Sequence, residues 1–600
     1  MKIKSLNKIP LCLAAIYFWG LTTAIAQEPL KLDGLTAFEP NKGTWQEAGA
    51  VMAELDKINV LKIENGKGIL VNLPTKKNKG EDLVSKEKFG DIDLEMEFMV
   101  APNSNSGVYL MGQYEIQILD SWTKTNPRAG DMGGIYERWD ESKPEGQKGF
   151  GGHAPRQNVS KAPGIWQQLS ISFQAPRFDE QGQKTKNAKF ISVMLNGVLI
   201  HENLELYGPT RGALVADEIA TGPIRIQGDH GAVAFRNIQV TQFDTELPEL
   251  SGLKYKVYQG FFDKEPEFAQ LKPVIEGSLN EISDQISAPS GQNIIHYQGH
   301  LSIPESGEYT FLMGAPSGRA GLKINGKKEL PLIEGYQFQT IALEKGLLPI
   351  EILVSKTNDW SKTGLELSIA GPGLRMTPLS QSRVAPSNQV DPILVNTQEV
   401  PMLRSFIELP DGQKLTHAIS VSSPQKVHYS FDLSKGNLAQ VWRGDFLDAT
   451  PMWHERGNGV SRPLGAVVFL GNPTRTIHGT TFQSGNVEFI PKGYQVKDNG
   501  IEYRYLSQGL SFKDLITSRS DGKGLDRSIT VEGASGNKRL TIAEGSDIKM
   551  IRDGLYWVVD KGYYLQLDPK SPSKPVLESN QNGKALMVSI GLPVQYSLLF

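Results

Sequence analysis

Cysteine is almost absent from this chain. The only cysteine among its 600 residues is Cys12, which lies in an apolar run near the N-terminus. A single cysteine excludes an intramolecular disulfide and a cysteine-based zinc site. Stability must therefore come from hydrophobic cores, and a chain of this length is expected to contain three or four of them.

A strong charge of either sign is also lacking. The formal net charge is −3, and no basic stripe runs along the sequence. Nucleic acid is therefore not expected as a partner. Beyond the N-terminal segment, no apolar run approaches the length of about 20 residues that a membrane helix needs, so we expect no membrane span in the mature chain.

The N-terminal segment has the pattern of an export signal. Three lysines precede an apolar run at 9–19, and a small-x-small pattern follows at 24–26. We expect a signal peptide over 1–26, with an uncleaved anchor as the alternative. Cleavage would also remove Cys12, and a secreted chain without cysteine fits the bacterial periplasm.

Long stretches with helical periodicity are missing as well. The chain has 61 glycines and 35 prolines between short segments in which apolar and polar residues alternate. Residues 91–98 alternate without a fault, and Asn196-Gly197 stands between two apolar runs as a hairpin turn would. These features predict an all-β protein built of sandwiches and barrels.

Composition divides the chain into three blocks after the leader. A first domain is expected over 28–245 and a second over 250–380. A segment rich in Ser, Pro and Asn predicts a linker over 381–394, followed by a C-terminal β-sandwich domain over 395–600.

Two segments of the first block carry unusual polar residues. On a strand over 114–119, Glu115 and Gln117 share one face, and Asp120 joins that face only if the strand ends or bulges just before it. In the second segment, 222–230, the polar face carries a guanidinium, an amide and a carboxylate and runs into a glycine-flanked turn. Two strands that present such groups from one sheet face indicate a sugar site.

Several individual residues have two interpretations. His230 suits a proton carrier, or it is a hydrogen-bonded turn histidine. Arg236 grips a substrate oxygen or pairs with a carboxylate of the core. Tyr109 and Tyr136 stack on a sugar ring or simply pack.

The Glu115 strand resembles the catalytic strand of laminarinase-type sandwich glycosidases, which has the pattern Glu-x-Asp-x-x-Glu. Here the central position is Gln117 and the last is Asp120. A retaining two-carboxylate mechanism needs an acid and a nucleophile about 5–5.5 Å apart with their pKa values separated. Gln117 cannot tune a neighbour by charge, which disfavours an ordinary glycosidase.

A set of short motifs across the first block resembles the 3-keto-disaccharide hydrolase family. The motifs lie at 89–91, 105–108, 114–120, 134–136, 164–166, 195–197, 222–227 and 235–238. The resemblance covers about 30–245 and implies a concanavalin-like jelly roll. It also implies a carbohydrate substrate.

In that family a ketone at C3 of the sugar acidifies the proton on C2, which implies elimination of the C1 substituent followed by hydration. On this resemblance, Glu115 or His230 is expected to take the C2 proton. Asp120 or His230 is expected to protonate the departing oxygen. The ketone or enolate is expected to be held by Gln117, Gln227 and Arg236. Glu115, Asp120 and His230 are alternatively ligands of a divalent cation that acts as a Lewis acid. The rival functions are an ordinary glycoside hydrolase and a carbohydrate-binding protein without turnover.

The other blocks give weaker resemblances. Residues 307–311 and 322–327 resemble the protective-antigen-type β-barrel, whose sugar-binding members hold calcium through an acidic pair. The expected loop at 314–319 has no carboxylate, which disfavours calcium-dependent sugar binding and leaves a spacer or packing role as the alternative. The C-terminal block resembles a β-supersandwich, and its cluster around Trp442 is expected to be a buried aromatic core rather than a sugar platform.

Overall fold

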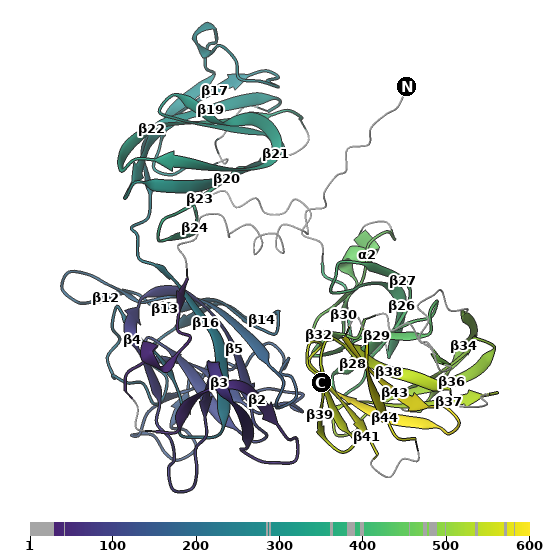
Figure 1. The fold of residues 1–600 in the computed structure, drawn as a ribbon. Coiled ribbons are helices and arrows are strands. Elements are labelled where there is room, and N and C mark those ends of the chain that lie inside the picture. The colour runs from purple at the N-terminus through teal and green to yellow at the C-terminus, as the bar shows by residue number, and fades with distance from the viewer. Residues whose placement is uncertain are drawn as a thin grey trace, which may run out of the picture. The chain divides into compact units, whose positions relative to one another are not determined.

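The computed structural model describes residues 29–40, 43–283, 286, 290–359, 364–380, 391–396, 401–454, 457–471, 477–478, 489–498, 500–533, 538–568, 573–580 and 583–600. The predicted signal peptide, 1–26, and residues 381–390 of the predicted linker lie outside them. Within these residues, no helix has the length and apolar character to cross a membrane. The chain is all-β, with several antiparallel sheets (Figure 1).

The first of the two sheets in the N-terminal region has eight strands. Its order is β14-β13-β10-β5-β16-β3-β2, with β1 pairing β16. The strands are β1 (Leu30–Lys31), β2 (Trp45–Ala53), β3 (Leu61–Asn72), β5 (Asp91–Val100), β10 (Gln167–Gln174), β13 (Ala188–Leu195), β14 (Val198–Leu206) and β16 (Val233–Phe243). The predicted Asn196-Gly197 turn joins β13 to β14, and Asn196 has the positive φ of 52° that such a turn requires.

The second sheet of this region has four strands in the order β4-β15-β6-β7. They are β4 (Leu83–Phe89), β6 (Asn105–Leu110), β7 (Tyr114–Leu119) and β15 (Gly222–Ile226). Two short hairpins, β8–β9 (Arg138–Trp139 and Gly149–Phe150) and β11–β12 (Arg177–Phe178 and Lys184–Lys186), and a 3₁₀ turn, η3 (Leu35–Ala37), complete the region.

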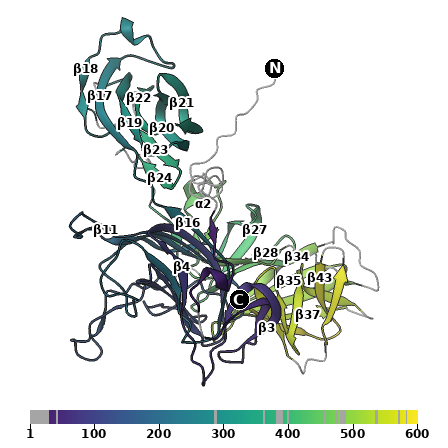
Figure 2. The ribbon, with the colours of Figure 1, turned by 60° about the vertical axis from the view of Figure 1, so that its left-hand side comes forward.

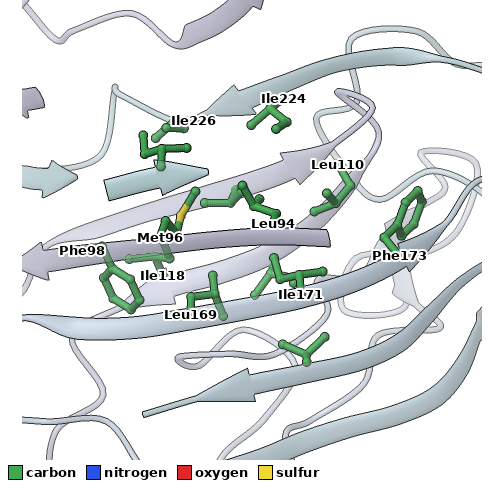
Figure 3. Close-up of a cluster of buried hydrophobic side chains, with 14 of the residues drawn as sticks. Leu94, Met96, Phe98, Leu110, Ile118, Leu169, Ile171, Phe173, Ile224 and Ile226 are labelled. Atoms are coloured by element: carbon green, nitrogen blue, oxygen red, sulfur yellow. The ribbon is translucent and has the colours of Figure 1, made fainter. Parts of the chain in front are cut away.

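A hydrophobic core lies between these two sheets (Figure 3). Leu94, Met96 and Phe98 of β5 alternate with polar residues and point into it, as the period of two predicts. From the smaller sheet, Ile116 and Ile118 of β7 enter the same core. The even-numbered residues of β7 therefore face inward, which turns Glu115 and Gln117 to the outer face.

Residues 241–389 belong to a separate compact unit. Its sheet has the order β18-β17-β19-β22-β20-β23-β24, with β21 pairing β20, and Figures 1 and 2 both show β17, β19 and β22 side by side. The elements are β17 (Glu249–Gln259), η4 (Phe268–Gln270), β18 (Ile275–Leu279), β19 (Asn293–Ile303), β20 (Gly307–Ile324), β21 (Lys327–Leu343), β22 (Gly346–Lys356), β23 (Glu366–Gly371) and β24 (Leu374–Pro378).

The loop expected at 314–319 is not a separate loop, because these residues lie inside strand β20. The pairing of β20 with β21 shifts register between Ala315 and Arg319. Before this irregularity β20 also pairs β23, and after it β20 pairs β22. A bulge lets one long strand bend and change its neighbour, so turn-like residues do not end it.

The C-terminal residues form four more sheets, of five, eight, four and three strands. The five-stranded sheet has β26 (Met402–Glu408), β27 (Lys414–Val421), β28 (Val427–Asp432), β29 (Asn437–Arg443) and β32 (Ala466–Phe469). The eight-stranded sheet has β34 (Phe489–Lys497), β35 (Gly500–Ser507), β36 (Leu510–Ser518), β37 (Gly524–Glu532), β39 (Ile548–Arg552), β40 (Leu555–Val558), β41 (Tyr563–Leu567) and β44 (Val594–Leu599). The four-stranded sheet has β33 (Ile477–His478), β38 (Arg539–Gly545), β42 (Val576–Asn580) and β43 (Gly583–Ser589). The three-stranded sheet has β25 (Leu394–Val395), β30 (Leu447–Asp448) and β31 (Arg462–Pro463). A short helix, α2 (Thr450–His454), lies in the same part of the chain.

Residues 31–240 and 390–600 group into one compact unit. A shared apolar cluster includes Val51 and Trp122 from the first stretch with Trp557 and Tyr564 from the second. Trp442 is fully buried in another cluster, where its indole nitrogen donates to backbone carbonyls at 3.1 Å. The burial and hydrogen bonds of Trp442 thus match the expectation of a buried aromatic core at this position.

Candidate functional site

A row of four side chains crosses the outer face of the smaller sheet. Arg225 of β15 lies opposite Tyr109 of β6, and Tyr109 lies opposite Glu115 of β7. The segment after β7 extends the sheet, because Tyr136 N donates to Glu115 O at 3.1 Å and residue 135 bridges residue 116. Tyr136 therefore faces Glu115, and directly opposed residues have Cβ atoms about 4.5–5.5 Å apart.

A second row runs parallel to the first. Gln227 N donates to Gly107 O at 2.9 Å, Gly107 is opposite Gln117, and Gln117 N donates to Gly134 O at 2.8 Å. The two rows place two amides beside one carboxylate on a single sheet face. Because strand positions two apart share a face, the sequence predicted this alignment of Glu115 with Gln117.

The Glu115 carboxyl is the group of the first row whose pKa the surroundings shift toward neutrality. Glu115 is only 2% exposed. Burial raises the pKa of Glu115 to about 7, the hydrogen-bonded Tyr109 hydroxyl and the Arg225 charge lower it, and the carboxylates of Asp82 and Asp229 raise it. With the Gln117 amide nitrogen turned toward Glu115, it donates to Oε1 at 3.1 Å. Near neutral pH, Glu115 can therefore both accept and release a proton.

Arg225 packs against Tyr109 at the end of the first row. Its guanidinium carbon lies 3.6 Å from the centroid of the Tyr109 ring, and Nη1 donates to Gly212 O at 2.6 Å. Nε lies 3.4 Å from an oxygen of Asp82. One face of the Tyr109 ring is thus occupied by a cation, and its hydroxyl, whose single proton also serves Glu115, lies 3.2 Å from Arg211 O. Tyr109, at 2% exposure, packs within the site.

Gly107 leaves room for the Glu115 carboxylate. A Cβ atom at residue 107 would lie 2.1 Å from Glu115 Oε1. The carboxylate therefore lies over the bare backbone of β6. The backbone of Glu115 is also held, since its N–H donates to Thr210 Oγ1 at 3.1 Å.

Strand β7 ends at Leu119, so Asp120 is the first residue after the strand. Its carboxylate accepts hydrogen bonds from Asn103 N at 2.9 Å and from Trp122 N at 3.4 Å. These contacts hold the turn before β6 and the turn after β7. The structure therefore gives Asp120 backbone-capping partners.

His230 lies in the turn after β15, and its side chain is 51% exposed. Its Nδ1 is hydrogen-bonded to the carboxylate of Asp229. The backbone of the same turn is tied to the site, because Asn105 N donates to His230 O at 3.3 Å. A histidine held by a carboxylate and open to solvent can carry a proton.

Arg236 lies on β16, which belongs to the larger sheet. Its guanidinium donates to Glu97 Oε2 from Nε at 2.9 Å and from Nη2 at 2.6 Å. It also stacks 4.0 Å from the ring centroid of Trp166. The structure does not bring Arg236 to Glu115. Of the two interpretations of Arg236, the contacts match the one in which it pairs with a carboxylate.

The expected metal ligands do not converge. Within the described residues, no three His, Cys, Asp or Glu side chains are grouped as a metal site would group them. Asp120 uses its carboxylate on backbone N–H groups, and Glu115 is surrounded by Tyr109 and Gln117. Glu115, Asp120 and His230 therefore do not fit one cation as they stand.

Sequence reasoning missed two features of the site. It placed a guanidinium on the polar face at 225 but gave it no role, although Arg225 aligns with Tyr109 once the two strands are paired. It also gave no role to the segment that lines a pocket of about 510 Å³ together with Tyr136 and Glu137; the lining residues of this segment are Lys124, Asn126, Arg128, Ala129, Gly130 and Asp131. No motif in that segment signals a pocket.

Comparison with known proteins matches the N-terminal region to one family. The family described as the 3-keto-alpha-glucoside-1,2-lyase-like domain matches residues 32–241. No curated protein sequence matches the chain.

Solved structures that resemble the chain include two described as "putative glycosyl hydrolase" from Parabacteroides distasonis. The first is 24% identical, with 36% of this chain and 84% of that one covered, at a TM-score of 0.25. The second is 19% identical, with 36% and 98% covered, at a TM-score of 0.23. TM-scores this low support no inference about this chain.

The family match spans both sheets of the N-terminal sandwich and both polar rows. Residues 32–241 are therefore a 3-keto-disaccharide hydrolase domain, of the 3-keto-alpha-glucoside-1,2-lyase-like type, within a longer all-β chain.

Proposed function

We propose that the chain is an enzyme that cleaves 3-keto-glycosides by removing the C2 proton, expelling the C1 substituent and adding water. One observation carries this proposal. Glu115 is a buried carboxyl whose pKa lies at about 7, in the polar row of a domain of this family. A base with its pKa near the working pH is the group that such a proton abstraction needs.

The chemistry balances without a cofactor that changes oxidation state. The C3 ketone acidifies the C2–H bond, Glu115 accepts that proton, and the bond's electron pair forms an enolate. Collapse of the enolate forms the C1–C2 double bond and breaks the C1–oxygen bond, and the departing oxygen takes up a proton. Water then adds at C1 while C2 regains a proton, which gives net hydrolysis.

The remaining roles follow from what each side chain faces. His230, hydrogen-bonded to Asp229 and half exposed, supplies the proton to the departing oxygen. Gln117 and Gln227 of the second row hold the ketone and enolate oxygen, because amide N–H groups stabilise developing negative charge. Arg236 has no part in this assignment, and Asp120 shapes the turn at the end of β7.

Access to Glu115 requires a movement in the site. Glu115 and Gln117 are 2% and 5% exposed, so a sugar reaches the carboxylate only when a covering group turns away. The Gln117 amide, 3.1 Å from Glu115 Oε1, is the group we assign to this movement. It exchanges its bond to the carboxylate for one to the substrate.

Replacing Glu115 tests the function directly. Glu115→Gln keeps the size of the side chain but cannot accept the C2 proton, so turnover of a 3-keto-glucoside should fall about 10²–10⁴-fold. Release of the C1 substituent is measured for the 3-keto-glucoside and for its unoxidised parent, with and without chelator. Glu95→Gln, on a strand of the other sheet, is the matched control and should keep wild-type turnover.

Three outcomes would change the assignment. Turnover of Glu115→Gln within about threefold of wild type removes Glu115 as the base. Release from the unoxidised parent as well favours an ordinary glycoside hydrolase, and binding without release favours a carbohydrate-binding protein. Loss of activity with chelator would bring a metal into the mechanism.

The finer architecture and the location are proposals too. We infer a concanavalin-like jelly roll at 28–245, supported by its two packed antiparallel sheets. A protective-antigen-type barrel at 250–380 and a β-supersandwich at 395–600 rest on sequence motifs and on the antiparallel sheets of those regions. Export to the periplasm rests on the sequence of residues 1–26 and is tested by N-terminal sequencing of the mature protein.

A further inference from the structure

We propose that the outer face of strands β20, β21 and β23 is a carbohydrate-binding site. Tyr336 and Phe338 stack there on the C–H faces of pyranose rings, and Glu366 accepts hydrogen bonds from sugar hydroxyl groups. We call these three residues the 336–366 platform, and we assign to it the neutral, unoxidised rings of a polysaccharide, bound without calcium. The platform lies in the unit of residues 241–389, and none of its residues has a part in the proposed function.

The platform residues share the sheet face that points away from the core of their unit. Phe311 and Met313 of β20 belong to that core, so Gly314 points to the opposite face. Gly314 pairs with Tyr336 of β21 on one side and with Glu366 of β23 on the other. Figures 1 and 2 both show β21, β20 and β23 side by side. Tyr336 and Glu366 therefore lie on the outer face, in one row across three strands.

The ring of Tyr336 lies along the surface of this row. A Cβ atom at Gly314 would lie 2.5 Å from Tyr336 Cδ1 and 2.6 Å from Cε1, so the ring covers the bare backbone of β20. Its hydroxyl reaches past β20 to a hydrogen bond with Glu366, and burial together with this carboxylate raises the pKa of Tyr336. The hydroxyl therefore keeps its proton and donates it, and the carboxylate of Glu366 retains lone pairs for a second donor.

Both rings of the platform stay in contact with solvent. Tyr336 is 40% exposed and Phe338 is 49% exposed, and Phe338, two positions along β21, lies about 7 Å farther on the same face. Elsewhere on the outer face the chain covers its own apolar side chains. Phe268 packs there against Tyr258, whose neighbour Val257 points into the core. The two open rings therefore distinguish the platform from the covered part of the same sheet.

The size and the polar surroundings of the platform favour a sugar over a protein partner. The exposed parts of the two rings amount to about 200 Å², whereas a stable protein interface takes about 800 Å² from each partner. Thr310 and Thr340, whose hydroxyl groups are hydrogen-bonded at 3.0 Å, form the row beyond Phe338. Flat rings with hydrogen-bonding groups at their edges match a pyranose, which has C–H groups on its faces and hydroxyl groups around its rim. The single carboxylate of the platform repels acidic sugars and falls short of the six to eight oxygen ligands that calcium takes.

Calorimetry of the full-length protein tests this site. The probes are four unoxidised β-linked hexasaccharides, built of 1,4-linked glucose, 1,3-linked glucose, 1,4-linked xylose and 1,4-linked mannose, and we expect at least one to bind equally with and without EDTA. Tyr336→Thr with Phe338→Thr should lower the association constant about tenfold or more, because both rings lose their apolar contact with the sugar. Glu366→Ala keeps both rings and should lower it several-fold. Phe261→Thr, which removes a ring that is 57% exposed in the same unit outside the platform, is the control and should bind like wild type.

Absence of binding to all four probes would overturn the proposal, as would wild-type affinity in both the double variant and Glu366→Ala. Loss of binding in EDTA would overturn a calcium-free site. If thermal unfolding shows that the double variant does not fold, Glu366→Ala decides. A wild-type dimer that the double variant converts to a monomer in sedimentation, without sugar binding, would make the platform a contact between two copies instead. Turnover of a 3-keto-glucoside is a separate measurement, so failure of this site and failure of the proposed function are distinguishable.

Discussion

At the scale of single residues, the environment of Glu115 decides its chemistry. The alternation of 114–119 predicts that Glu115 lies on the polar face of a strand, where a carboxylate would ordinarily meet water. The structure instead buries it beside Tyr109 and Gln117, and this burial raises its pKa to about 7. The pKa that suits Glu115 to the proposed role of base thus comes from desolvation, a property that residue type and spacing do not specify.

Arg225 is predicted to set the pH at which Glu115 works. As the proposed base, Glu115 must be a carboxylate, so kcat/KM should fall as pH drops through the pKa of about 7. The Arg225 charge lowers this pKa. Arg225→Met should therefore move the acidic limb of the pH profile to higher pH, with most of the activity regained above it, and Arg225→Lys should restore part of the shift. The profile of kcat/KM against pH is the measurement.

Arg177→Met provides the control for loss of an ion pair, because Arg177 pairs with Asp91 at 2.7 Å outside the site. Its pH profile should match that of wild type. An unchanged acidic limb in Arg225→Met, in a protein that thermal unfolding shows to be folded, would contradict the role of Arg225.

At the scale of elements, the pairing of β6 with β7 builds the site. Gly107 and Gln117 are opposite each other, as are Tyr109 and Glu115. The sequence predicts each strand and its polar face, but the register between strands depends on which residues finally pair. Residues 133–136 likewise extend the sheet beyond β7 through backbone hydrogen bonds that no sequence motif predicts.

Gly107→Ala is predicted to lower kcat while leaving the fold stable. A Cβ atom would lie 2.1 Å from Glu115 Oε1, so the carboxylate must move by an ångström or more. A displacement of this size can cost up to about 10²-fold in rate. The flexible glutamate can yield without strain in the backbone, and the melting temperature should stay near that of wild type.

Gly90→Ala is the matched variant, because a Cβ atom there meets its nearest neighbour at 3.6 Å. It should retain wild-type kcat. Wild-type kcat in Gly107→Ala would show that the position of Glu115 over β6 is not needed for turnover.

At the scale of the whole molecule, the chain separates into units by how its apolar surface is buried. Residues 241–389 have a core of their own, which includes Val257, Tyr297 and Ile352. Residues 31–240 and 390–600 share an apolar cluster in addition to the core that each of the two stretches has. Two blocks that are separated along the sequence therefore bury apolar surface against each other.

A fragment of residues 246–380 is predicted to fold by itself. Its main core draws on residues within that range, so calorimetry of the fragment should show one cooperative transition that also occurs in the full-length protein. A fragment without cooperative unfolding would contradict the independence of this unit. The isolated fragment is also the material with which to test sugar binding by the middle block.

Removal of residues 390–600 is predicted to destabilise the N-terminal sandwich. Trp122, whose indole nitrogen donates to Phe600 O at 2.6 Å, and Val51 would lose their apolar partners. We expect a lower melting temperature of the sandwich and stronger binding of a hydrophobic dye. An unchanged melting temperature would show that the shared cluster contributes nothing to its stability.

The sequence alone determined the all-β class, the polar face that carries Glu115 and Gln117, and the likeness of the N-terminal region to a family that the comparison confirms over 32–241. Each of these depends on local alternation or on motifs, which are properties of neighbouring residues. Tertiary structure decided the burial of Glu115, the stacking of Arg225 on Tyr109, the ion pair of Arg236 on the other sheet and the pocket beside Tyr136 and Glu137. These depend on contacts between strands and loops distant in sequence, and such contacts exist only once the chain has folded.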